Sequence, residues 1–394
     1  MEEIVIVGAA RTPIGSFGKA FAGVPAAELG VAAARAAMER AGIRPEDVDA
    51  ATIGTIGQFG RDAYIARAVS LGAGLPVEAP ALAVNRLCGS GLQAIISAAG
   101  AIRIGDAEAV LAVGTENMSR YPYLSFGARW GSRLGDSELV DGLLVALSDP
   151  FTEGHMGTTA ETVAGRWTVS REDQDAFALL SQQRAAASVA AGRFADEIVP
   201  VGVPGKGGQT VLVETDEHPR PGTSAEALAA LKPAFREGGS VTAGNSSGIA
   251  DGAAAVIVAT PARAAALGLR ARARLVAHAV VGVPPEIMGI GPIPAVRKVL
   301  KRAGLTLDEI DLIELNEAFA AQAVACIREL GMDPERVNVN GGAIALGHPI
   351  GATGCIMTVK LLGEMERRGS RYGLVTACIG GGQGIAAIFE RVSG

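Results

Sequence analysis

Two cysteines and one histidine are the side chains in this sequence whose surroundings suit them for chemistry. The first, Cys88, lies in the segment Val84-Asn85-Arg86-Leu87-Cys88-Gly89-Ser90-Gly91, where a short apolar strand gives way to an amphipathic helix. The beginning of a helix presents unpaired N–H groups and a partial positive charge, so we expect this thiol to ionise readily and act as a nucleophile. Taken alone, the segment fits a packed core cysteine about equally well.

The histidine is His348, which lies in a glycine-rich segment, residues 340–354, that leads into an apolar helical pattern. Imidazole exchanges protons near neutral pH more easily than any other side chain, and the chain has only four histidines. We therefore expect His348 to be a general base. The alternative is a loop histidine whose nitrogens are satisfied by backbone hydrogen bonds.

The second cysteine, Cys378, stands at the end of an apolar strand that runs into the turn Gly380-Gly381-Gly382. Consecutive glycines can direct several backbone N–H groups at one point, which is how an oxyanion hole is built. A phosphate-binding loop is disfavoured, because no Lys-Ser or Lys-Thr pair follows at the required offset. Cys88, His348 and Cys378 thus each stand at a glycine-rich strand end.

An internal repeat predicts the elements that position these residues. The order helix, Ala-Gly-Ile, acidic turn and apolar strand in residues 27–53 recurs as helix, Ala-Gly-Leu, acidic turn and strand in residues 293–315. Gly42 and Gly304 are offset by 262 residues, and so are Asp49 and Asp311. The repeat predicts two related halves in which strands alternate with helices.

Between the halves, residues 119–248 are richer in polar residues and turns. We expect a helix over residues 171–191 that begins after Ser170 as N-cap, with Asp173 three residues further on. An insertion of this length usually carries function or oligomer contacts.

Composition narrows the class of protein. With 394 residues, of which 49% are apolar and 19% charged, we expect a globular chain of two or three domains. A net charge of −6 argues against nucleic-acid binding but not against an anionic small molecule. Four scattered cysteines form neither a disulfide framework nor a metal motif, and no signal peptide or membrane-spanning run is present. We expect a cytoplasmic, metal-free protein without a membrane partner.

Several segments together resemble the signature blocks of the thiolases, in the family's order and spacing. They are Asn85-x-x-Cys88-Gly89-Ser90-Gly91, residues 241–252, Asn316-Glu317-Ala318-Phe319, Gly347-His348-Pro349 and Cys378-Ile379-Gly380-Gly381-Gly382. The resemblance covers essentially the whole chain. It implies an α/β thiolase fold, with duplicated βαβαβ halves in a five-layered α-β-α-β-α sandwich and an inserted loop domain.

The resemblance also implies a division into domains. Residues 1–118 with 249–268 would form the N-terminal half, 119–248 the loop domain that binds coenzyme A, and 269–394 the C-terminal half. Residues 121–144 resemble the family segment that makes tetramer contacts, so we expect a homo-oligomer, a dimer of dimers. The alternative is a solvated surface excursion.

For the catalytic residues the resemblance implies a Claisen condensation. Cys88 attacks an acyl-CoA after His348 removes its proton, and Cys378 then takes a proton from the α-carbon of a second acetyl-CoA. One oxyanion hole would use His348 and a water held by Asn316, and the other the N–H groups of Cys88 and Gly380. Asn316 also fits the N-cap of a helix beginning at Glu317.

The binding residues are likewise implied by the resemblance. Arg220 would lie near the nucleotide end of coenzyme A, and His155, Met156 and Met288 beside the acyl group, although methionine also fills cores readily. The pantetheine tunnel would be lined by Phe235, Ala243, Gly244, Ser247, Ala318 and Phe319. We interpret His218 as a surface residue, His278 as structural, and Cys326 and Cys355 as packing residues.

Three functions compete. Residues 153–157 resemble the short-chain biosynthetic thiolases and favour an acetyl-CoA C-acetyltransferase of lipid metabolism, with coenzyme A thioesters as substrates and no tightly bound cofactor. Residues 216–221 and 287–292 resemble 3-ketoacyl-CoA thiolases of fatty-acid breakdown about as well. A non-catalytic CoA- or lipid-binding protein is permitted by the fold alone but disfavoured by two reactive thiols. A ketoacyl synthase is disfavoured because such enzymes pair the nucleophile with two histidines.

Overall fold

The N-terminal half of the molecule is a mixed sheet covered by helices. The computed structural model describes residues 2–131, 133–152 and 154–392. The sheet has the order β4-β3-β5-β12-β1, and β3 runs parallel to β4 and β5 while β12 runs antiparallel to β5 and β1. Its strands are β1 (Val5–Arg11), β3 (Ala50–Gly54), β4 (Ala81–Val84), β5 (Ala109–Asn117), β12 (Ala250–Ala259) and the short β2 (Gly15–Ser16), which pairs with β12. Its helices are α1 (Ala26–Ala41), α2 (Ile65–Ala73) and α3 (Ser90–Arg103).

The C-terminal half repeats this plan. Its strands follow the order β14-β15-β16-β13, with β14 parallel to β15 and the other pairs antiparallel. They are β13 (Ala273–Gly282), β14 (Leu312–Leu315), β15 (Tyr372–Ile379) and β16 (Gln383–Arg391). The helices are α9 (Pro292–Ala303), α10 (Ala320–Leu330), α11 (Ala343–Leu346) and α12 (Thr353–Arg368). Helix α8 (Pro261–Ala266) contacts β1 and belongs to the N-terminal half.

The predicted repeat is confirmed down to single hydrogen bonds. Gly42 and Gly304 end α1 and α9 in the left-handed conformation, with φ of 73° and 68°, which glycine adopts without steric cost. One carboxylate oxygen of Asp49 accepts the N–H groups of residues 108 and 109, and Asp311 does the same for residues 371 and 372. The two halves therefore share a turn as well as an order of elements.

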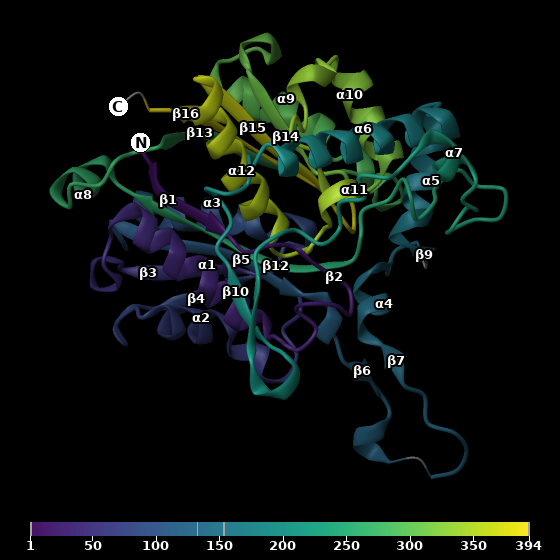
Figure 1. The fold of residues 1–394 in the computed structure, drawn as a ribbon, viewed down its shortest axis with the longest axis horizontal. Coiled ribbons are helices and arrows are strands. Elements are labelled where there is room, and N and C mark those ends of the chain that lie inside the picture. Colours follow the sequence, from purple (N-terminus) through teal and green to yellow (C-terminus); the bar gives the residue numbers. More distant parts are fainter. Residues whose placement is uncertain (1, 132, 153, 393–394) are drawn as a thin grey trace.

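The halves stack face to face, which gives the predicted layers (Figure 1). Helices α3 and α12 lie between the two sheets, while α1 packs on the outer face of the first sheet and α9 on that of the second. The two sheet layers are also joined to each other. Residues Val5 and Ile6 of β1 pair with Arg274 and Ala273 of β13, so the described strands join at one edge into a single ten-stranded sheet.

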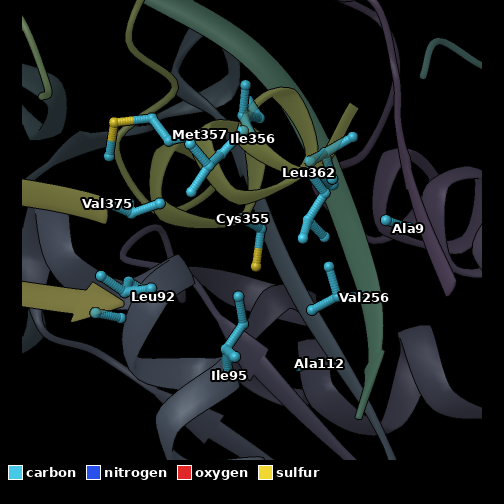
Figure 2. Packing of buried hydrophobic residues seen from close by; sticks show 14 of the residues in the cluster. Ala9, Leu92, Ile95, Ala112, Val256, Cys355, Ile356, Met357, Leu362 and Val375 are labelled. Atoms are coloured by element: carbon cyan, nitrogen blue, oxygen red, sulfur yellow. The ribbon is translucent and has the colours of Figure 1, made fainter. Parts of the chain in front are cut away.

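The contact between α3 and α12 is close because small residues meet there. A Cβ atom on Gly354 would lie 2.1 Å from the backbone nitrogen of Leu92, so only glycine allows this approach. Figure 2 shows Cys355 directed between Leu92 and Ile95 of α3. Cys355 and Cys326 are both fully buried, and their predicted packing role is confirmed.

The segment between the halves contains the predicted helix and others that the sequence did not reveal. Helix α6 (Arg171–Ala190) begins with a capping box formed by Ser170 and Asp173, as predicted. The further helices are α4 (Gly142–Ala146), α5 (Met156–Arg166) and α7 (Ala225–Ala229). The short strands are β6 (Tyr123–Leu124), β7 (Val140–Asp141), β8 (Ser148–Asp149), β9 (Gly154–His155), β10 (Val201–Pro204) and β11 (Thr210–Val213).

Residues 121–131 and 133–145, with β6 and β7 at the base, extend away from the body (Figure 1). We name these residues the arm. Its exposed apolar side chains are Tyr123, Phe126, Trp130, Leu134, Leu139, Leu144 and Val145. In the described part of the chain, no helix combines the length and the apolar character needed to cross a membrane.

Candidate active site

A cavity of about 520 Å³ collects loop ends from both halves and from the inserted segment. Cys88, His348 and Gly380 line it, although they are far apart in the sequence. Nine of the ten predicted binding residues also line it: His155, Met156, Arg220, Phe235, Ala243, Ser247, Met288, Ala318 and Phe319. The tenth, Gly244, is absent from the lining, and a Cβ atom there would meet Leu228 and Leu231.

Cys88 lies in a 3-10 turn, Leu87–Gly89, immediately before α3. The preceding residue, Leu87, has a φ of 46°, a strained conformation for a branched side chain, and Asn85 accepts its N–H through the side-chain oxygen. The turn is thus held in a conformation that places the partly buried thiol in the cavity.

The expectation that Cys88 ionises readily is wrong for the resting protein. Burial raises the pKa of the thiol to about 11, and this effect outweighs the backbone N–H groups of Gly380 and Cys88, which bond the sulfur and lower the pKa. The predicted pair of N–H donors therefore surrounds the sulfur, but the thiol needs a base to become nucleophilic.

His348 lines the same cavity as Cys88, and its tautomer is the one that a base requires. Its Nδ1 lies 2.6 Å from the Thr353 hydroxyl, and this hydroxyl donates its single hydrogen to the carbonyl of Pro349 at 2.9 Å. Thr353 must therefore accept from Nδ1–H, which leaves the lone pair on Nε2. Burial lowers the pKa of His348 to about 4, so the ring is neutral at pH 7 and can accept a proton.

Asn316 lies directly after β14, where its side-chain nitrogen is 3.4 Å from Nε2 of His348. Helix α10 begins at Ala320 with Phe319 as N-cap, so the alternative of an N-cap at Asn316 is wrong. The backbone of residues 316–319 is instead held by other contacts, including a bond from the Gln322 side chain to the Asn316 carbonyl. The amide of Asn316 is thereby free to face His348.

Cys378 is the penultimate residue of β15 and is completely buried. It belongs to an apolar cluster behind the cavity wall, with Ala160, Val241, Met288, Ala318 and Phe319. Burial, followed by the neighbouring sulfurs of Cys88 and Cys326, raises the pKa of this thiol well above its ordinary value. Cys378 is therefore a neutral thiol at rest, and its thiolate would be a strong base.

Aromatic rings from the inserted segment and from Phe319 of the C-terminal half form one side of the cavity. His155 stacks on Phe235 with 4.8 Å between ring centroids, and Phe235 meets Phe319 edge-on at 5.9 Å. Such a wall suits a flat or apolar part of a ligand. Glu153, which stands in the segment that favoured the short-chain enzymes, lies outside the described residues.

His218 was interpreted as a surface residue, and this interpretation is wrong. Its ring lies between Gly248 and Gly347, because a Cβ atom on either glycine would overlap it, and it lines the cavity. Burial, with the positive charge of Arg220, lowers the pKa of His218. No local pattern marked this residue, since its two glycine neighbours come from distant segments.

The sequence patterns also did not reveal the cavity residues in the loop after β2 and in the apolar wall near Cys88. Lys19 adds a second cation to Arg220 in the lining, and Thr353 orients His348. The apolar residues are Met118, Leu147, Ile249 and Ile350. Thr353 carried a faint signal, because it lies five residues after His348 at the beginning of a predicted helix.

Comparisons with known proteins agree with this geometry. The family model "Thiolase, N-terminal domain" matches residues 4–262, and "Thiolase, C-terminal domain" matches residues 269–391. An acetyl-CoA acetyltransferase of Pseudomonas aeruginosa is 53% identical over 99% of this chain and 100% of its own length. A beta-ketothiolase of Cupriavidus necator is 52% identical over 99% of each chain.

Among solved structures, human mitochondrial 3-ketoacyl-CoA thiolase in complex with CoA superimposes with a TM-score of 0.96. That protein is 45% identical to this chain, and the match covers 100% of this chain and 98% of the human one. The signature segments, the paired halves and both family models therefore lead to one conclusion. The chain belongs to the thiolase family.

Proposed function

We propose that this chain is an acetyl-CoA C-acetyltransferase, which joins two acetyl-CoA molecules reversibly into acetoacetyl-CoA and CoA. The observation that carries the proposal is the arrangement at Cys88. Its sulfur is bonded by two backbone N–H groups in a cavity that also holds His348 with an unprotonated Nε2. The name of the Pseudomonas aeruginosa relative supports the same activity, and that of the beta-ketothiolase of Cupriavidus necator supports a thiolase reaction more broadly.

In the first step, Nε2 of His348 takes the proton of Cys88 and the sulfur attacks the thioester carbon. The N–H groups of Gly380 and Cys88 already converge at this point, so they can stabilise the oxyanion that forms. The intermediate collapses to an acetyl group on Cys88 and a departing CoA thiolate. The neutral resting state of both Cys88 and His348 matches this order of events.

The raised pKa of Cys378 sets the order of the second step. A neutral thiol cannot act as a base, so Cys378 must first give its proton to the departing CoA thiolate. Its thiolate then takes a proton from the α-carbon of a second acetyl-CoA, and the carbanion attacks the acetyl group on Cys88. The proton held by His348 returns to Cys88, which leaves every group as it began. The enolate oxygen would be held by His348 and by a water that Asn316 binds.

Coenzyme A enters this scheme as part of the substrates. Lys19 and Arg220 would attract its phosphates, and the aromatic wall of His155, Phe235 and Phe319 would hold the pantetheine. The related human structure in complex with CoA supports this assignment.

Further assignments belong to the same proposal. The exposed apolar side chains of the arm support contact with other copies of the chain in a dimer of dimers. We propose the same division into domains. Residues 119–248 form the loop domain, residues 1–118 with 249–268 the N-terminal half, and residues 269–394 the C-terminal half. A cytoplasmic location and a place in lipid metabolism likewise remain predictions.

A second candidate is a 3-ketoacyl-CoA thiolase that accepts longer chains, which the name of the related human protein favours. The side chains of Met118, Leu147 and Ile350 pack around Cys88. They leave room for a short acyl group on the sulfur, which favours the acetyltransferase. The test compares kcat/KM for thiolysis of acetoacetyl-CoA, 3-ketohexanoyl-CoA and 3-ketopalmitoyl-CoA. A strong preference for acetoacetyl-CoA would support the acetyltransferase. Equal or better rates on the longer chains would move the protein to the second candidate.

A further inference from the structure

Glu116 carries a buried carboxylate as the penultimate residue of strand β5, and it is only 1% exposed. Its Oε2 accepts the backbone N–H groups of Ile56 and Gly351, each at 3.0 Å. Its Oε1 accepts the N–H of Gly57 at 3.0 Å and the hydroxyl of Tyr121 at 2.9 Å. Four donors therefore converge on one carboxylate, which is a fully built site with no role in the scheme above.

The donors come from three segments that the carboxylate ties together. Ile56 and Gly57 follow β3, Tyr121 stands at the base of the arm, and Gly351 lies three residues after His348. A Cβ atom on Gly351 would come within 2.5 Å of Oε2, so glycine permits the turn after His348 to approach the carboxylate this closely. Ile350, which lies between His348 and Gly351 in the sequence, belongs to the apolar cluster that contacts Cys88.

The chemistry of the site requires a group that only accepts hydrogen bonds. An ionised carboxylate does so with both oxygens, whereas an amide of the same shape has an NH2 group that would face one of the donors. The charge also reaches the nucleophile, because Glu116 raises the pKa of Cys88 in addition to the larger effect of burial. On its outer side Glu116 borders a second cavity that carries Arg61, Asp62 and Arg120.

We propose that Glu116 is a positioning residue for the thiolase reaction, which fixes the turn carrying His348 against the end of β3 and so keeps the imidazole aligned with Cys88. This inference rests on the roles proposed above for Cys88 and His348. The negative charge of Glu116 also opposes ionisation of the Cys88 thiol, an effect smaller than that of burial.

The test is the substitution Glu116→Gln, which keeps the shape and removes the charge. We expect kcat to fall by up to about a hundredfold with KM little changed, since a displacement of about 1 Å in catalytic geometry has a cost of that order. The rate of Cys88 alkylation by iodoacetamide, followed against pH with mass spectrometry, should shift to lower pH. A purely structural defect would not produce that shift.

The matched control is Asp49→Asn, because Asp49 accepts two backbone N–H groups at the opposite end of β5 and far from Cys88 in sequence and fold. We expect it to leave the alkylation profile unchanged. If Glu116→Gln does not fold, Tyr121→Phe removes one donor without altering the charge and should lower kcat by about threefold to tenfold, with KM unchanged.

Either of two results would overturn the proposal. One is an unchanged kcat in folded Glu116→Gln or, if that variant does not fold, in Tyr121→Phe. The other is a lowered kcat with the same alkylation profile and an equal loss in Asp49→Asn. Failure of the roles proposed for Cys88 and His348 has a different signature, since alkylation of Cys88 in the unsubstituted protein would then leave its thiolase activity intact.

Discussion

The hydroxyl of Thr353 lies 2.6 Å from Nδ1 of His348 and decides which nitrogen of that ring carries the proton. The hydroxyl donates its own hydrogen to the carbonyl of Pro349, which lies four residues before Thr353, the first residue of α12. A helix-start residue thus fixes the tautomer of the proposed base, and it directs the free lone pair toward Asn316 and the cavity.

Substitution of Thr353 should therefore impair catalysis more than binding. Thr353→Val removes the acceptor of Nδ1–H while keeping the shape, and we expect kcat to fall by about ten- to a hundredfold, within the range that general-base catalysis contributes. Thr353→Ser keeps the hydroxyl and should retain most of the activity. Steady-state kinetics with acetoacetyl-CoA and CoA measure both, and equal kcat values for the two variants would contradict the assigned role.

Cys378→Ala should separate the two half-reactions. Cys88, His348 and the two N–H donors remain in place, so acetyl-CoA should still acetylate Cys88, with the departing CoA thiolate taking its proton from water instead of Cys378. Condensation, in contrast, loses its base. We expect the acetyl group to accumulate on Cys88 in intact-protein mass spectrometry, and acetoacetyl-CoA formation to fall by at least about a hundredfold. Condensation at the original rate would mean that another group removes the α-proton.

The resting thiol of Cys88 should react slowly at neutral pH. With its pKa raised to about 11 by burial, the thiolate fraction increases about tenfold per pH unit below that value. The rate of alkylation by iodoacetamide should therefore still rise between pH 8 and pH 10. A plateau below pH 8 would show that a nearby cation or His348 already holds Cys88 as a thiolate.

Arg11 should contribute strongly to stability. It is fully buried and pairs with Glu197 at 3.0 Å and with Asp216 at 2.7 Å, which joins β1 to the segment that carries His218. Arg11→Met would leave two buried carboxylates unpaired, and we expect it to lower the free energy of unfolding by about 3–5 kcal/mol.

Urea denaturation measures this loss, and Arg44→Met is the matched control. The Arg44 side chain is 74% exposed in its pair with Asp47, so its removal should change the free energy of unfolding by less than about 1 kcal/mol. A loss for Arg11→Met as small as that of the control would show that the buried carboxylates find other partners or bind protons.

Local patterns in the sequence determined much of the fold. The matched glycines that end α1 and α9, the capping box of α6 and the apolar strand before Cys378 are all encoded by neighbouring residues. Such features depend on propensity and spacing within a few residues, so they can be inferred without tertiary contacts. The same applies to the glycine-rich turns that mark Cys88, His348 and Cys378.

The tertiary structure decided the protonation states and the supports of the site. A helix start alone predicts a low pKa for Cys88, but burial of the thiol raises it, and burial depends on segments from both halves. Glu116 and Thr353 were missed as supports, and His218 was placed wrongly, for the same reason. Desolvation and long-range hydrogen bonds depend on atoms brought together from hundreds of residues apart, whereas the sequence by itself determined the elements and motifs that bring them there.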